Sequence, residues 1–179
     1  MYCYLDNSAT TKPCQAAVDA ANRAMTEAFG NPSSLHAYGL AALQLLEDAR
    51  RQVAKALSAD SAEIYFTPSG TAANNTAIFG AAAKAGRRGG KIVTTAFEHP
   101  SVENAMRRLE EQGFTVVRLL PDTDGNITAE QFHNAIDEQT VLVSLMAVNN
   151  EVGSILPFDK IAGILRRKKS KALLHVDAV

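Results

Sequence analysis

The sequence lacks the features that mark secreted, membrane and zinc-binding proteins. Its 179 residues include two cysteines, Cys3 and Cys14, and neither belongs to a CxxC pair, so no metal site is expected. No apolar run approaches the length that spans a bilayer. The first residues, MYCYLDNSATT, contain neither a basic segment nor a long apolar segment, so no signal peptide is expected. These absences favour a cytoplasmic protein.

The sequence also lacks an excess of charge of either sign. Its 18 Lys and Arg residues nearly balance 19 Asp and Glu residues, for a formal net charge of -1. That balance argues against a nucleic-acid partner and against an anionic membrane surface. The basic run at 166–169 falls on an expected helix, where a solvated face is the favoured interpretation. What is present is an ordinary globular composition, 46% hydrophobic and 21% charged, with enough chain for a sizeable core.

Short apolar segments alternate with helical patterns along most of the chain. Segments typical of strands lie at residues 64–66, 91–95, 115–119, 141–146 and 172–176. Helical patterns cover about 41–57 and begin again near Thr71, Ser101 and Phe158. The run TAEQ that starts at Thr128 predicts a capping box at the start of a further short helix.

This alternation predicts an α/β fold. A strand, a helix and a second strand in succession favour parallel pairing, so we expect a mostly parallel sheet with helices on both faces. The stretch before residue 64 is mostly helical in pattern, with a Pro-containing turn at 31–34. We therefore expect a helical N-terminal arm outside the main sheet.

The segment FTPSGTAANN at 66–75 is the first candidate for ligand binding. We expect a strand end, a tight turn of small residues and the start of a helix. Gly70 permits close approach of the backbone to a ligand, and free N–H groups with the helix dipole favour an anion such as phosphate. The hydroxyls of Ser69 and Thr71 would add donors. An ordinary N-capped helix is the alternative, since the segment matches neither a Walker loop nor GxGxxG.

Two further candidates follow expected strands. His99, in TTAFEHP at 94–100, precedes a helix at the carboxyl end of a strand, where ligands collect in parallel sheets. Its imidazole could stack on a flat ring or move a proton, or could simply cap the helix. Asn149, in AVNNEVG at 147–153, offers a neutral amide donor, although consecutive amides also form turns.

Asp177 follows the last apolar segment, ALLHV at 172–176. A carboxylate buried at a strand end needs a partner, and a protonated heteroaromatic nitrogen would serve. Together, the four places offer a phosphate cradle, a flat side chain, an amide donor and a carboxylate. Pyridoxal phosphate fits that combination, because its ring nitrogen is typically paired with an Asp.

The residues carrying this pattern resemble those of a known family. The matching stretches are YLDNSATT at 4–11, FGNPSSLH at 29–36, FTPSGTAANN at 66–75, EH at 98–99, VNNEVG at 148–153 and HVDA at 175–178. In order and spacing they resemble the amino-terminal half of a cysteine desulfurase, in the class V aminotransferase group of fold-type I pyridoxal-phosphate enzymes. The resemblance implies a large-domain sheet of that fold, incomplete here, at 41–179. It assigns residues 1–40 to an arm or part of a small domain.

The resemblance also implies residue roles. Gly70 and Thr71 would hold the cofactor phosphate. His99 would stack on the pyridine ring and act in proton transfer. Asn149 would donate a hydrogen bond to the ring hydroxyl oxygen, and Asp177 would pair with the pyridinium nitrogen.

Other implications concern the substrate and the partners. Ala9, Thr10 and Asn31 would border the substrate side. The activity implied is removal of sulfur from L-cysteine, which leaves alanine and an enzyme persulfide. The sulfur would pass to an acceptor protein for iron–sulfur cluster or thio-cofactor assembly, and the enzyme would be a homodimer.

The chain departs from the family pattern in several ways. The Ser-x-His-Lys segment that supplies the cofactor-binding lysine, the catalytic cysteine on a mobile loop and a carboxylate-binding arginine are absent, so we expect a fragment that is inactive alone. Ala72 stands where the family commonly has Glu, and Pro68 replaces a small residue. The alternatives are a selenocysteine lyase or an aminotransferase on the same scaffold, or an inactive fragment acting as an assembly partner.

Overall fold

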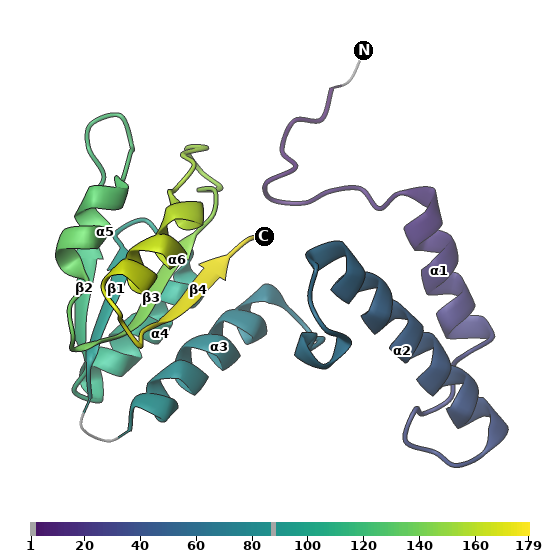
Figure 1. Ribbon diagram of the computed structural model, residues 1–179. Coiled ribbons are helices and arrows are strands. Elements are labelled where there is room, and N and C mark those ends of the chain that lie inside the picture. Colours follow the sequence, from purple (N-terminus) through teal and green to yellow (C-terminus); the bar gives the residue numbers. More distant parts are fainter. Residues whose placement is uncertain (1–2, 87–88) are drawn as a thin grey trace. The chain divides into compact units, whose positions relative to one another are not determined.

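The computed structural model describes residues 3–86 and 89–179, which form two compact units, Met1–Phe66 and Thr67–Val179 (Figure 1). Residue 40, where the sequence suggested a domain boundary, lies within the helix at Ala37–Leu57. The assignment of 41–179 to a cofactor-binding domain rests on function and not on compactness, so it stays a prediction.

In the described residues of the first unit all regular secondary structure is helical, as the sequence predicts for the arm. It contains α1 (Gln15–Thr26), α2 (Ala37–Leu57) and the short 3-10 helix η1 (Ser61–Glu63). His36 caps α2 by accepting a hydrogen bond from the Gly39 N–H at Nδ1. The turn before α2 packs tightly, because a Cβ on Gly39 would overlap the carbonyl oxygen of Ser34. Helix α2 begins four residues before the expected start.

The predicted strand at 64–66 is wrong. These residues form no strand and pair with none in the described part of the chain, and Tyr65 and Phe66 are exposed. A strand exists only through its hydrogen-bonded neighbour, and the apolar character of three residues does not supply one. The segment that precedes Gly70 is therefore a loop.

The second unit is an α/β structure with a four-stranded parallel sheet. Its elements are α3 (Gly70–Ala85), β1 (Lys91–Thr95), α4 (Pro100–Glu111), β2 (Thr115–Leu119), α5 (Ala129–Ala135), β3 (Thr140–Met146), α6 (Phe158–Arg167) and β4 (Leu173–Asp177). The strand order is β2-β1-β3-β4, and every pairing is parallel. The predicted fold class and the other four predicted strands are thus confirmed.

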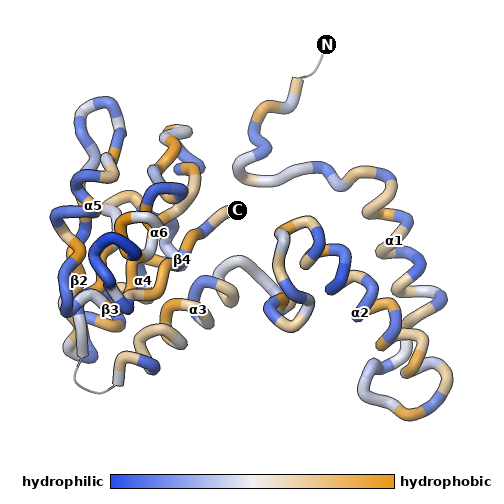
Figure 2. The backbone as a smooth tube through the Cα atoms, in the orientation of Figure 1, coloured by the Kyte–Doolittle hydropathy of each residue, from blue (hydrophilic) through white to orange (hydrophobic). Residues whose placement is uncertain are grey.

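The alternation of side chains along the strands divides the core between the two faces of the sheet. On one face, Ile92 and Leu142 pack with α3 and α4. On the other, Val93 and Val143 pack with α5 and α6. In Figure 2, apolar and polar residues alternate along α6, as expected for a helix with one face on the core and the other in solvent. Helices therefore cover both faces, as expected for a doubly wound sheet.

Polar caps set where the helices begin. Ser69 caps α3 by accepting a hydrogen bond from the Ala72 N–H, and His99 caps α4 with Pro100 at the first helical position. The predicted capping box at Thr128 and Gln131 is present at the start of α5. No helix in residues 3–86 and 89–179 is both long enough and apolar enough to cross a membrane.

Candidate active site

Strand periodicity places two polar side chains of β4 on the face covered by α3. His175 and Asp177 are two residues apart, so they point to the same side of the sheet. In the register with β3, Ser144 lies beside His175 and Met146 beside Asp177. Ser144 shares its face with Leu142, which packs against α3 and α4. The polar end of β4 thus lies under the first turns of α3.

Asn74 of α3 contacts both of these side chains. Its Nδ2 donates to Asp177 Oδ2 at 2.8 Å, and its Oδ1 lies 3.1 Å from His175 Nε2. On β3, Ser144 Oγ lies 2.9 Å from His175 Nδ1. Asn74 is 6% exposed and Ser144 is fully buried, so these polar atoms depend on one another for hydrogen bonds.

A second branch of the cluster leads to His99. Asn74 Nδ2 also donates to Ser101 Oγ at 2.9 Å, and that oxygen lies 2.8 Å from His99 Nδ1. The Ser101 N–H donates to the same ring nitrogen. His99 is therefore both the cap of α4 and a member of the cluster that contains Asp177. Capping the helix, which the sequence offered as the alternative, does not separate His99 from the candidate site.

The N-terminus of α3 meets the end of β4. A Cβ added to Gly70 would lie 3.5 Å from a side-chain carbon of Val179, which is ordinary contact. Ser69 accepts from the Ala72 N–H with its side chain and from the Ala73 N–H with its carbonyl oxygen. In the described residues the N–H groups of Gly70 and Thr71 have no such partner, as is usual for a first helical turn. These two exposed residues lie one turn before Asn74, on the Asp177 side of the unit.

Asn149 is engaged within the protein. Its Oδ1 accepts from the N–H groups of Glu151 and Val152, which forms the turn after β3. Its Nδ2 donates to the Phe97 carbonyl oxygen at 2.9 Å and to Met146 Sδ at 3.3 Å. A thioether is a weak acceptor, so the hydrogen directed at Met146 is the one that a ligand oxygen could take.

Glu98, beside His99, is a titratable residue to which the sequence analysis assigned no role. Its Oε1 accepts from the hydroxyl of Thr95 and from the N–H of Met146, which ties the loop after β1 to the end of β3. Its Oε2 is buried and has no hydrogen-bond partner in the described part of the chain. Burial raises the pKa of this carboxyl to about 7, against the effect of the two hydrogen bonds.

Asp177 has no cationic partner in the part of the chain that the structure describes. Its Oδ2 accepts from Asn74 and its Oδ1 from the Val179 N–H at 3.3 Å, but among the described residues no Lys, Arg or His forms an ion pair with it. Burial lowers the pKa of the neighbouring His175, which favours the neutral imidazole. A half-buried carboxylate held only by neutral donors suits a ligand that brings a positive charge.

The residues predicted on the substrate side belong to the first unit. Ala9 and Thr10 are exposed, and their N–H groups both donate to the Asp6 carbonyl oxygen. Asn31 is exposed in the turn before α2, where its Oδ1 accepts from the Ser33 N–H. Their role toward a substrate stays a prediction.

Four members of this cluster were not predicted from the sequence: Asn74, Ser101, Ser144 and His175. The spacing of His175 and Asp177 was a usable signal, because residues two apart on a strand share a face. The parts played by Asn74 of α3 and Ser101 of α4 could not be predicted from the sequence, because they depend on how these helices pack on the sheet. The described residues contain no group of three or more His, Cys, Asp or Glu that could hold a metal ion.

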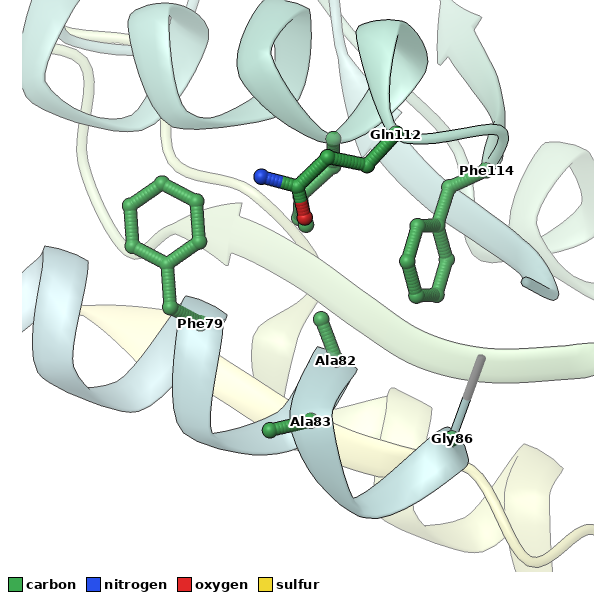
Figure 3. Close-up of a pocket in the computed structure, with 7 residues that line it drawn as sticks. Phe79, Ala82, Ala83, Gly86, Gln112 and Phe114 are labelled. Atoms are coloured by element: carbon green, nitrogen blue, oxygen red, sulfur yellow. The ribbon is translucent and has the colours of Figure 1, made fainter. Parts of the chain in front are cut away.

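A cavity of about 580 Å³ lies at the other end of α3 (Figure 3). Its wall is formed mainly by apolar side chains, including Phe79, Leu109 and Phe114, with Gln112 as the one polar side chain among the residues that line it. Among the residues that the structure describes, its lining includes none of the cluster residues and no charged group. The polar cluster at the start of α3 is therefore the candidate active site.

The chain belongs to the aminotransferase class-V family, which matches residues 3–179. It is 47% identical over 162 residues to a NifS/IcsS protein homolog of Lactobacillus delbrueckii subsp. bulgaricus, covering 90% of this chain and 42% of that protein. It is 41% identical over 176 residues to a cysteine desulfurase IscS of Methanosarcina thermophila, covering 98% of this chain and 43% of that protein.

Solved structures show the same relationship. A NifS-like protein superposes with a TM-score of 0.94 at 37% identity, covering all of this chain and 49% of that chain. A structure described as SspA in complex with cysteine superposes with a TM-score of 0.91 at 33% identity, covering 98% and 50%. The family resemblance inferred from the sequence is confirmed, and the chain spans under half the length of the two curated relatives.

Proposed function

We propose that the intact protein is a pyridoxal-phosphate-dependent cysteine desulfurase. It would take sulfur from L-cysteine and leave alanine and a persulfide. The observation that carries the proposal is the half-buried Asp177 carboxylate, which is held by Asn74 and the Val179 N–H and has no cation paired with it in the described chain. Relatives named cysteine desulfurase, at 41% identity, support the choice of reaction.

The chain's own residues fit the cofactor in three respects. The N–H groups of Gly70 and Thr71 at the start of α3 would bind its phosphate, with the helix dipole favouring the negative charge. Asp177 would hold a proton on its ring nitrogen. Asn149 would exchange its contact to Met146 Sδ for one to the ring hydroxyl oxygen.

Pyridoxal phosphate, when bound, supplies an electron sink that stabilises negative charge developing on a carbon of an amino acid. Asp177 would maintain that capacity, because its charge keeps the proton on the ring nitrogen. His99 would lie against the ring and move a proton through Nε2, since its Nδ1 accepts hydrogen bonds from Ser101. Ala9, Thr10 and Asn31 would border the substrate.

The remaining parts of the proposal concern the whole protein. We propose a cytoplasmic homodimer that passes sulfur to an acceptor protein for iron–sulfur cluster or thio-cofactor assembly. A selenocysteine lyase is the second candidate, because both reactions would use the same cofactor-binding residues, Gly70, Thr71, His99, Asn149 and Asp177. Substrate comparison distinguishes the two.

The test uses the intact protein, L-cysteine and a thiol reductant. We expect alanine and sulfide in equal amounts, and Asp177→Ala should lower the rate of alanine formation by about 100-fold or more, the size seen when one preorganised electrostatic group is removed. Asp124→Ala, an exposed acid in a turn of the same unit, should leave the rate unchanged. Release of selenide from selenocysteine without sulfide from cysteine would favour the lyase. Near-normal turnover by Asp177→Ala would contradict the role of Asp177.

A further inference from the structure

In the cluster beneath α3, the chemistry of the side chains determines which atom donates and which accepts in each hydrogen bond. A carboxylate only accepts hydrogen bonds, so the Asn74 atom 2.8 Å from Asp177 Oδ2 must be the amide nitrogen. The other end of the amide, Oδ1, then faces His175 Nε2 at 3.1 Å. An amide oxygen only accepts, so Nε2 must carry a hydrogen.

The same reasoning fixes the other ring nitrogen of His175. In an imidazole with its hydrogen on Nε2, Nδ1 is the acceptor. Ser144 Oγ, 2.9 Å away, must then donate to it. Burial favours the neutral ring by lowering the pKa of His175, and the negative charge of Asp177 acts in the opposite direction. Ser144 and His175 therefore present a single oriented donor to Asn74.

The second hydrogen of Asn74 extends the order to α4. It is donated to Ser101 Oγ at 2.9 Å, so the Ser101 hydroxyl hydrogen is left to point at His99 Nδ1, 2.8 Å away. Asn74 thus donates to Asp177 and Ser101 at the same time, in an orientation that Asp177 and His175 both favour. If the amide flipped, Asn74 would direct its oxygen at an acceptor, Asp177 Oδ2, and its nitrogen at a donor, Nε2 of His175.

We propose that Asn74, oriented by a neutral His175 with its hydrogen on Nε2, is the positioning residue that holds Asp177 and Ser101 in the geometry the site needs. Ser144 supports this tautomer of His175 from the neighbouring strand by donating to Nδ1. This inference deepens the proposed function and rests on it for its kinetic readout. The tautomer of His175 is independent of any reaction.

The first experiment measures cofactor binding and turnover in the intact protein. Asn74→Ala should weaken the affinity of the apoprotein for pyridoxal phosphate by about tenfold or more, the lower end of what loss of an outer-shell partner costs. It should lower kcat for L-cysteine more than it raises KM. Asn104→Ala removes an exposed amide of α4 that makes none of these hydrogen bonds, and should match the unmodified protein.

A pair of His175 variants separates positioning from folding. His175→Gln places an amide N–H at a reach similar to that of Nε2, so it should retain most of the cofactor affinity. His175→Leu has similar bulk but no donor, and should approach the defect of Asn74→Ala. Thermal unfolding of both variants controls for loss of structure. Equal affinity in the Gln and Leu variants would overturn the positioning role, and this pair decides the question if Asn74→Ala does not fold.

The second experiment reads the His175 tautomer by nitrogen-15 NMR of the imidazole rings, with the signal assigned by its absence in His175→Gln. We expect one neutral ring with its hydrogen on Nε2, and Ser144→Ala should reduce that preference. A hydrogen on Nδ1, or fast exchange between tautomers, would overturn the inference whatever the activity. If the expected tautomer is seen and the His175 pair behaves as expected in cofactor binding, but cysteine is not a substrate, the inference stands and the proposed reaction fails.

Discussion

Asn74 and Asp177 lie 103 residues apart in the chain and are joined by a hydrogen bond of 2.8 Å. The bond connects the first turns of α3 to the last residue of β4, the edge strand of the sheet in this unit. It brings the N-terminus of a helix, where we propose that phosphate binds, and an acceptor carboxylate to one place. That convergence is what makes the carboxyl end of β4 a candidate site.

The buried carboxyl of Glu98 should make stability depend on pH. Its pKa in the folded protein is raised by burial from 4.5 to about 7, so the folded state binds the proton more tightly than the unfolded chain. The stabilisation is fully present below pH 4.5 and is lost as the pH rises through 7. The side chain of Glu98→Gln stays uncharged at every pH. The difference in unfolding free energy between this variant and the unmodified protein should therefore shift by about 3 kcal/mol in favour of the variant as the pH rises from 4.5 to 8.

Urea unfolding at several pH values measures this effect. Glu138→Gln, an exposed carboxyl in the same unit, is the control and should keep the original pH dependence. Parallel curves for Glu98→Gln and the unmodified protein would mean that Glu98 ionises normally in the fold.

Neighbouring threonines of β1 should respond in opposite ways to the same substitution. Thr94 is fully buried, and its hydroxyl has no hydrogen-bond partner in the described chain, so Thr94→Val should stabilise the fold by about 1 kcal/mol or more. The hydroxyl of Thr95 donates to Glu98, so Thr95→Val should destabilise it by about 1–3 kcal/mol. Thermal unfolding of both variants provides the measurement. A loss of stability in Thr94→Val would indicate an unseen partner for that hydroxyl.

Two glycines in helices should also respond differently to alanine. A Cβ on Gly39, in α2, would overlap the Ser34 carbonyl oxygen, so Gly39→Ala should cost about 1–3 kcal/mol through backbone displacement. Gly80 lies in α3 with no atom within 4 Å of an added Cβ, so Gly80→Ala should add up to about 1 kcal/mol through helix propensity. Denaturant midpoints of the two variants test the pair, and equal effects would be inconsistent with the tight turn before α2.

A protein consisting of residues 1–179 alone should self-associate. Strand β4 lies at an edge of the sheet, and exposed apolar side chains include Leu35, Leu57, Tyr65 and Ile155. An unpaired strand edge and exposed apolar surface both favour association. Light scattering during size-exclusion chromatography gives the mass. A stable monomer at micromolar concentration would contradict this expectation.

Much of the fold could be predicted from the sequence because its signals are local. Four strands and the helix starts at Thr128 and Phe158 follow from apolar periodicity and capping residues, which act over a few neighbouring residues. The family motifs likewise pointed to Gly70, His99 and Asp177. The wrong strand at 64–66 shows the limit of such signals, since its apolar character carried no information about a pairing partner.

Sequence by itself therefore determined the order of elements from α3 onward, the parallel α/β class and the carboxyl-end placement of His99, Asn149 and Asp177. Only the tertiary structure decided that Asn74 donates a hydrogen bond to Asp177, and that Asn149 donates to the Phe97 carbonyl oxygen and to Met146 Sδ. The physical reason is that strand register and helix docking bring together polar atoms distant in the chain. Each buried polar atom then takes the partner that this packing makes available.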